Sequence, residues 1–171
     1  LARLTTLTQL SIGNLLLDTS ILEDQRPLLP LASVRILKLR DPIQNGDWNN
    51  PIDCTFVRFI ATLFPNLEKL VIGIFSDKNF KILSPDMFSE FARLVHLTEL
   101  DLTGVQIKME TLEAAHLDPM PNVRVLHLRN IYCDSLEPIG AQFCRIFSAV
   151  FPSLTELKLV FLQKESIREN L

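Results

Sequence analysis

Residues 97–107 read L-T-E-L-D-L-T-G-V-Q-I, and the apolar framework of this segment recurs along the whole chain. The framework is three aliphatic residues in the spacing L-x-x-L-x-L, here Leu97, Leu100 and Leu102. Six copies of three give eighteen positions, and every one is Leu, Ile or Val. The copies start 26 to 33 residues apart, and such a recurrence predicts a repeat architecture. The other copies are Leu7-Leu10-Ile12, Val34-Leu37-Leu39, Leu67-Leu70-Ile72, Val123-Leu126-Leu128 and Leu154-Leu157-Leu159.

Each copy alternates apolar and polar residues over its middle, which predicts a short strand with one buried face. The predicted strands span residues 7–12, 34–39, 67–72, 97–102, 123–128 and 154–159. Between them, apolar residues at helical spacing predict helices over 53–64, 85–95, 108–117 and 135–151, and a weaker one over 19–29. Pro65, Pro121 and Pro152 each stand two residues before a framework copy, where proline ends a helix. Stacked units of this kind build a parallel sheet backed by helices.

The pattern Leu-x-x-Leu-x-Leu with a helix in each unit resembles the leucine-rich repeat family, over about residues 4–163. The long, irregular units with helix-Pro-x-Leu junctions look most like the intracellular leucine-rich repeats of F-box proteins. The resemblance implies an α/β solenoid of about six repeats, curved as a horseshoe, with a parallel sheet on the concave face and helices on the convex face. It also implies substrate recognition for a ubiquitin ligase. The F-box that would dock the ligase adaptor is not recognisable in these residues.

The chain departs from the family pattern behind each strand. The family places Asn or Cys three residues after the third framework position, where the side chain satisfies backbone groups of the turn. The residues found there are Leu15, Pro42, Phe75, Val105, Ile131 and Leu162. We therefore expect a diverged array whose turns are satisfied by backbone groups or water.

Length and composition favour one domain over residues 1–171, with a sizeable core. A net charge of −3 and the lack of any Lys/Arg cluster argue against a nucleic-acid partner. No apolar run approaches the roughly 18 residues that a membrane helix needs. The chain starts without Met, inside the approach to a predicted strand, so we expect a piece of a longer protein.

Three cysteines, without the paired clusters of extracellular repeat domains, favour a reduced intracellular setting, cytoplasmic or nuclear. Cys133 and Cys144 are expected to be small core residues.

The outward-facing strand positions should line the concave face and form its binding surface. Two of the predicted strands carry basic residues on this face, Lys38 and Arg40 on one and His127 and Arg129 on the other. A strand with acidic Glu99 and Asp101 lies between them. Such a mosaic of charges suits a protein or peptide better than a phosphate backbone. Solvated positions without a partner are the alternative for any single residue. The candidate partner-binding residues on the strands are Lys38, Arg40, Lys69, Val71, Glu99, Asp101, His127, Arg129 and Lys158.

Trp48, the only tryptophan, lies in the non-periodic segment 41–51. It is a candidate anchor for a partner at the edge of the concave face. The alternative is that Trp48 folds back over the core edge of the second unit, and the high average burial of tryptophan favours this reading.

Catalysis is not expected, and neither is a cofactor or a metal. The chain has no metal-binding His motif, paired C-x-x-C, Gly-rich phosphate loop or nucleophile elbow. His127 should meet Asp101 of the neighbouring strand, but no nucleophile stands with this pair. Two functions remain open. One is a recognition module that binds a protein or peptide, and the other is a structural or regulatory repeat segment of another intracellular receptor, such as a nucleotide-binding sensor.

Overall fold

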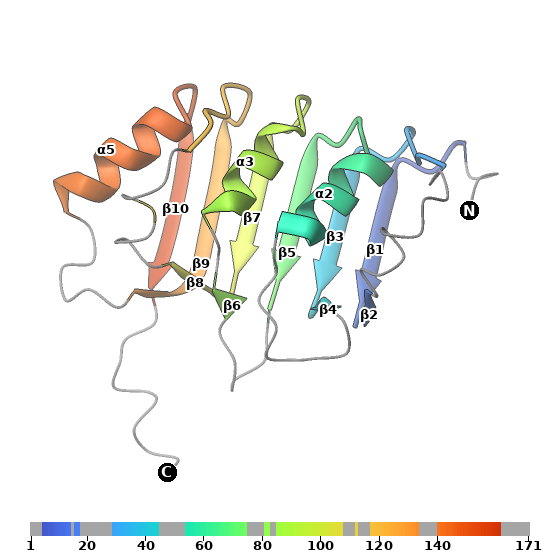
Figure 1. Ribbon diagram of the computed structural model, residues 1–171, viewed down its shortest axis with the longest axis horizontal. Helices are drawn as coiled ribbons and strands as arrows, with labels where there is room; N and C mark the ends of the chain where they lie inside the picture. Colours follow the sequence, from blue (N-terminus) through green and yellow to red (C-terminus); the bar gives the residue numbers. More distant parts are fainter. Residues whose placement is uncertain are drawn as a thin grey trace, which may run out of the picture.

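The computed structural model describes residues 5–14, 16–17, 29–44, 54–74, 81–82, 85–107, 112, 117–133 and 140–161. Within them, six parallel strands lie side by side in chain order and form a sheet that is not closed (Figure 1). The predicted α/β class and parallel sheet are confirmed. The strands are β1 (Gln9–Gly13), β3 (Ile36–Arg40), β5 (Lys69–Gly73), β7 (Glu99–Thr103), β9 (Val125–Cys133) and β10 (Glu156–Phe161).

Short strands continue beyond the carboxyl ends of the long ones. Strand β2 (Leu16–Leu17) pairs with β4 (Ile43–Gln44), and β6 (Lys81–Ile82) pairs with β8 (Val105–Ile107). Strand β8 also pairs with the end of β9 at Gln106 and Tyr132. These pairings extend the parallel arrangement past the turn that follows each long strand.

The framework residues are aligned across the sheet. Leu10, Leu37, Leu70, Leu100, Leu126 and Leu157 occupy one row. Each strand nevertheless begins two residues later than predicted, so the predicted starts are wrong by that amount. The reason is local, because the first framework residue closes a turn before the strand. Leu97, for example, donates its N–H to the Leu94 carbonyl at 2.8 Å.

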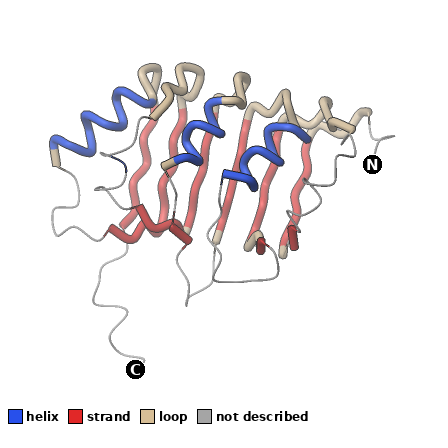
Figure 2. The backbone as a smooth tube through the Cα atoms, in the orientation of Figure 1, coloured by secondary structure: helices blue, strands red, loops and turns tan. Residues whose placement is uncertain are grey.

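Three helices lie against one face of the sheet (Figures 1 and 2). They are α2 (Cys54–Leu63), α3 (Asp86–Ala92) and α5 (Ala141–Val150). Each buries an apolar face at helical spacing against the framework rows. The predicted helices 53–64 and 85–95 are thus confirmed, as is the second half of 135–151. Nearly all of the predicted helices 19–29 and 108–117 lies outside the described residues, and Leu29, which is described, is not helical. None of the described helices has the length and apolar character needed to cross a bilayer.

Helix α5 corrects the expectation for Cys144, which is exposed rather than part of the core. Phe143 and Phe147 face the sheet, and a residue one position after Phe143 is rotated about 100° away from that face. The side chain of Cys133 lies outside the described residues.

A ladder of hydrogen bonds joins the starts of neighbouring strands. The carbonyls of Thr8, Arg35, Glu68, Thr98 and Arg124 each accept two successive backbone N–H groups from the next strand along the chain. The hydroxyls of Thr98 and Thr155 donate to two of these same carbonyls. Side-chain amides add to the ladder, because Asn66 donates to the Ala32 carbonyl at 2.9 Å and Asn122 to the Val95 carbonyl at 2.7 Å.

A second ladder follows the strand ends, where the family's Asn or Cys is missing. The N–H of the residue after each of β1, β3, β5 and β7 donates to the carbonyl of the residue that pairs with that strand's last residue, as in Gly104 to Arg129 at 2.8 Å. The turns behind these strands are therefore satisfied by backbone groups, as expected. Three of the four donors adopt positive φ, namely Asn14, Asp41 and Gly104, and so does Asn130 at the corresponding point within β9.

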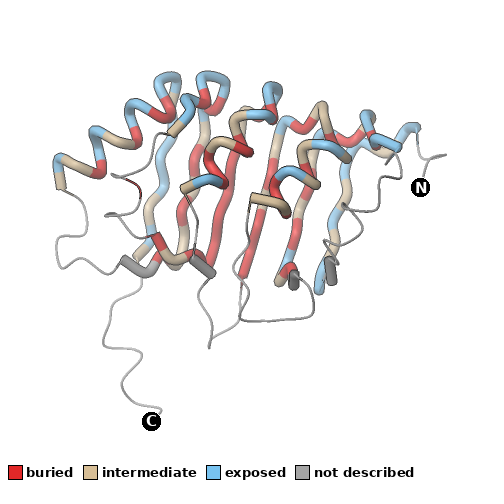
Figure 3. Tube along the Cα trace, in the orientation of Figure 1, coloured by how far each residue is buried: buried red, intermediate tan, exposed pale blue. Residues whose placement is uncertain are grey.

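Burial falls at both edges of the sheet (Figure 3). In the central strands the framework leucines are at most 2% exposed, whereas Leu157 in β10 is 43% exposed. Leu10 and Ile12 in β1 are only partly buried. The central strands therefore hold the core, and the edge strands contribute less to it.

Candidate partner-binding face

The face of the sheet opposite α2, α3 and α5 carries nine of the ten candidate binding residues; Trp48 lies outside the described residues. We call it the open face, since no described helix lies on it. Strand register arranges its side chains in three rungs. The first rung is Gln9, Ile36, Lys69, Glu99, Val125 and Glu156; the middle rung is Ser11, Lys38, Val71, Asp101, His127 and Lys158; the last rung is Gly13, Arg40, Gly73, Thr103, Arg129 and Val160.

Asp101 is the centre of a polar network on the open face. Its carboxylate accepts a hydrogen bond from Arg129 and lies 3.6 Å from His127 Nδ1. His127 Nε2 lies 2.8 Å from Glu156 Oε1, so the imidazole bridges two carboxylates from the strands on either side. The predicted contact between His127 and Asp101 is confirmed. These partners leave Asp101 only 9% exposed, although it points away from the hydrophobic core.

Lys69 and Glu99 form a second ion pair across β5 and β7. Both side chains are more than a third exposed, and exposed pairs of this kind stabilise a fold by at most about 1 kcal/mol. The value of these contacts lies in orientation. These ion pairs hold the charged side chains of β7 and β9 in fixed positions, and the paired charges partly neutralise one another.

The half of the open face formed by β1, β3 and β5 has a different charge. Its rung positions include three cations, Lys38, Arg40 and Lys69, and no carboxylate. Over all three rungs five Lys and Arg residues face three carboxylates, an excess of two positive charges in a chain whose net charge is −3. The sequence predicts the positions of these charges but not their partners, because the pairing of Lys69 with Glu99 and of Arg129 with Asp101 depends on side-chain conformation.

Arg40 has a glycine on each side, Gly13 on β1 and the buried Gly73 on β5. In the last rung Arg40 lies between Gly13 and Gly73, and a Cβ added at Gly13 would meet no atom within 4 Å. In the middle rung Lys38 lies between Ser11 and Val71, which are short side chains.

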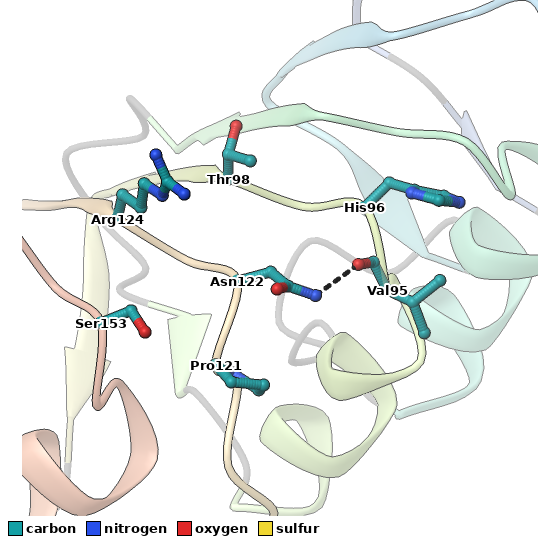
Figure 4. A pocket seen from close by; sticks show the side chains of 7 residues that line it. All are labelled: Val95, His96, Thr98, Pro121, Asn122, Arg124 and Ser153. Atoms are coloured by element: carbon teal, nitrogen blue, oxygen red, sulfur yellow. Dashed lines mark hydrogen bonds between the residues drawn. The ribbon is translucent and has the colours of Figure 1, made fainter.

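A shallow hollow of about 380 Å³ lies at the starts of β7, β9 and β10 (Figure 4). Figure 4 shows the Asn122 amide turned toward the Val95 carbonyl at its centre. The sequence pattern did not indicate this hollow. Much of its polar lining already takes part in the strand-start ladder, which favours a structural role for it. The lining residues are Val95, His96, Thr98, Pro121, Asn122, Arg124 and Ser153.

Among the described residues no group of three or more His, Cys, Asp or Glu side chains is placed to hold a metal ion. Comparison of the chain with protein-family models, with curated proteins and with solved structures finds no match in any of the three.

Proposed function

We propose that this chain is a leucine-rich repeat array of the solenoid type, and that it recognises a protein or peptide through the open face of its sheet. The supporting observation is the separation of the two faces. One face packs apolar framework residues against the helices, while the other presents three aligned rungs of polar, charged and small residues. A broad surface of fixed charges suits a macromolecular partner better than a small substrate.

The family resemblance extends this proposal. Helix-Pro-x-Leu junctions of the kind found in F-box proteins favour a substrate receptor of a ubiquitin ligase, whose adaptor would contact a region not in this chain. An intracellular setting, cytoplasmic or nuclear, belongs to the proposal, and the free thiols of Cys54 and Cys144 are consistent with it. The proposal includes no catalytic role and no cofactor.

A second function has one specific observation in its favour. Leu157 and Val160 on the edge strand β10 are 43% and 39% exposed, and exposed apolar residues at a sheet edge suit packing against further protein. In that case the chain is a structural or regulatory segment of a larger intracellular receptor, for example a nucleotide-binding sensor.

A charge-reversal comparison tests the proposal. Lys38, Arg40 and Arg129 are changed together to Glu. The wild type and this variant are each used in a pull-down from cell lysate, and the proteins that bind are identified by mass spectrometry. The control changes Arg35, Arg124 and Arg145 to Glu, which alters the net charge by the same amount away from the rungs. We expect partners of the wild type to be kept by the control and lost by the open-face variant. Circular dichroism must show that both variants are folded. Identical capture by both variants would refute the open face as the binding site.

A further inference from the structure

We propose that copies of this chain associate head to tail, with the outer edge of β1 in one copy pairing in parallel with the outer edge of β10 in the next. This association goes beyond the proposed function, since it uses the edges of the sheet and not its open face. Figure 1 shows β1 and β10 at opposite ends of the sheet, and among the described strands β1 pairs only with β3 and β10 only with β9. A sheet edge of this kind is a template for another strand.

The backbone of β1 faces outward at alternate residues. Ile36 donates its N–H to the Thr8 carbonyl at 3.1 Å, and in a parallel pair this turns the even-numbered residues of β1 toward β3. The N–H and C=O groups of Gln9, Ser11 and Gly13 therefore point to the outer edge. Strand β1 contains no charged residue and no proline, which are the residues that commonly block such an edge.

The backbone of β10 presents the matching groups. Glu156 donates its N–H to the Arg124 carbonyl at 3.0 Å, so the even-numbered residues of β10 face β9. The carbonyl of Thr155 and the backbone groups of Leu157 and Leu159 therefore point outward.

The strand-start ladder shows how the two edges would join. The carbonyl of the residue before each of β1, β3, β5, β7 and β9 accepts two successive N–H groups from the next strand. Thr155 is the corresponding residue before β10, and the corresponding donors in a second copy are Thr8 and Gln9. The register of the existing strand pairs, continued once more, places Gln9 beside Glu156.

The same register joins the apolar rows of the two copies. It places Leu10 beside Leu157 and Ile12 beside Leu159. Leu157 is exposed and the other three are only partly buried, although the framework leucines of the central strands are almost completely buried. The chain therefore carries both halves of one interface, which favours a second copy of the chain as the partner.

The side chains of the open face allow this pairing. Strand β1 contributes only neutral side chains to the junction, so neither charged residue of β10 meets a like charge. Ser and Gly on β1 leave room for longer side chains on β10. The neighbours across the junction would be Gln9 and Glu156, Ser11 and Lys158, and Gly13 and Val160.

Sedimentation velocity of the chain over a range of concentrations tests the association, with one variant that blocks each edge. Ser11→Pro removes an outward N–H from β1 and leaves the hydrogen bonds to β3 in place. Leu157→Lys puts a charge into the exposed apolar row of β10. We expect the wild type to form oligomers that grow with concentration, and each variant alone to associate at least about tenfold more weakly. Circular dichroism must show that both variants are folded.

A mixture of the two variants distinguishes head-to-tail pairing from symmetric pairing. Ser11→Pro keeps a free β10 edge and Leu157→Lys keeps a free β1 edge, so the mixture should form dimers and grow no further. Pairing of β1 with β1 would let Leu157→Lys dimerise alone, and pairing of β10 with β10 would let Ser11→Pro dimerise alone. Either result, or a mixture that stays monomeric, would overturn the proposal.

The charge at position 9 tests the register without affecting the backbone. Gln9 is exposed, and its neighbour within the same chain is the neutral Ile36. Beside Glu156 of the next copy, Gln9→Lys should tighten the association and Gln9→Glu should weaken it, each by about two- to fivefold. Added salt should reduce both effects. Equal association of the two variants would reject this register, and a wild type that stays monomeric at every concentration would reject the association as a whole.

Discussion

Replacing Gly104 by Ala should destabilise the protein strongly, because this glycine follows β7 at a point where two constraints coincide. Its φ is +73°, in the left-handed region, where a residue with a Cβ is strained by about 1 kcal/mol. A Cβ built on its backbone would also lie 1.9 Å from the carbonyl oxygen of Ile74, far inside the 3.4 Å at which ordinary contact begins. The Ile74 oxygen belongs to the backbone, so no side-chain rotation relieves the overlap.

The magnitude follows from these two constraints. Relief requires movement of backbone that two hydrogen bonds hold in place. Ile74 donates its N–H to Thr103 at 2.9 Å between β5 and β7, and Gly104 donates to Arg129 at 2.8 Å between β7 and β9. Overpacking of this kind costs about 1–3 kcal/mol, and the left-handed backbone adds about 1 kcal/mol. We expect a loss of about 2–4 kcal/mol, a large part of the roughly 5–15 kcal/mol of a typical domain.

The assay is urea denaturation followed by circular dichroism, and Gly13→Ala is the matched control. Gly13 ends β1, its φ is not in the left-handed region, and no atom lies within 4 Å of an added Cβ, so the change should stay within about 0.5 kcal/mol. Gly104→Asn separates the two constraints. Asn tolerates positive φ at the equivalent positions 14 and 130, but its Cβ meets the same oxygen, so it should rescue little. A loss below about 0.5 kcal/mol in Gly104→Ala would refute this reasoning.

Three further results are expected. Leu126→Ala should cost about 3 kcal/mol in urea denaturation, whereas Leu157→Ala in the same row should cost less than about 1 kcal/mol, since the two residues are 1% and 43% exposed; equal losses would contradict the burial. Arg58 holds the pKa of the nearly buried Glu90 below its ordinary value of 4.5, so the stability that Glu90 adds is complete above pH 4.5 and is lost as the pH falls through the lowered pKa. Glu90→Gln should therefore be less stable than the wild type at pH 7 and approach the stability of the wild type in acid, as followed by thermal unfolding. A stability difference that does not decrease in acid would contradict this prediction. Hydrogen exchange should be faster in β1 than in β7, because its framework is only partly buried, and equal protection in a monomer would reject this.

Sequence alone predicts the sheet and the approximate position of its strands, because Leu100 and its counterparts recur in the L-x-x-L-x-L spacing with a helical segment between successive copies. It also predicts which residues share the open face, since side chains alternate along a strand. It does not predict the strand starts, because Leu97 looks like a strand residue and instead closes a turn.

The side-chain contacts of Asp101 could be predicted from the sequence only in part. The contact with His127 follows from equivalent positions on adjacent strands, but the hydrogen bond from Arg129 links different rungs and depends on the rotamer of a long side chain. The residues that satisfy the strand starts, Asn66 and Asn122, follow proline in two junctions, and this Pro-Asn pair is the signal that could have revealed them.

The direction of the strand-start ladder has a consequence for synthesis on the ribosome. Each of the carbonyls at Thr8, Arg35, Glu68, Thr98 and Arg124 receives its donors only from residues that are translated later. While the chain emerges, the newest strand therefore offers unfilled acceptors to the next one, and water occupies them until that strand arrives. Strands are then added to the sheet in the order of translation. If the ribosome pauses after any unit, the newest strand still has the same carbonyl acceptors available for the next strand.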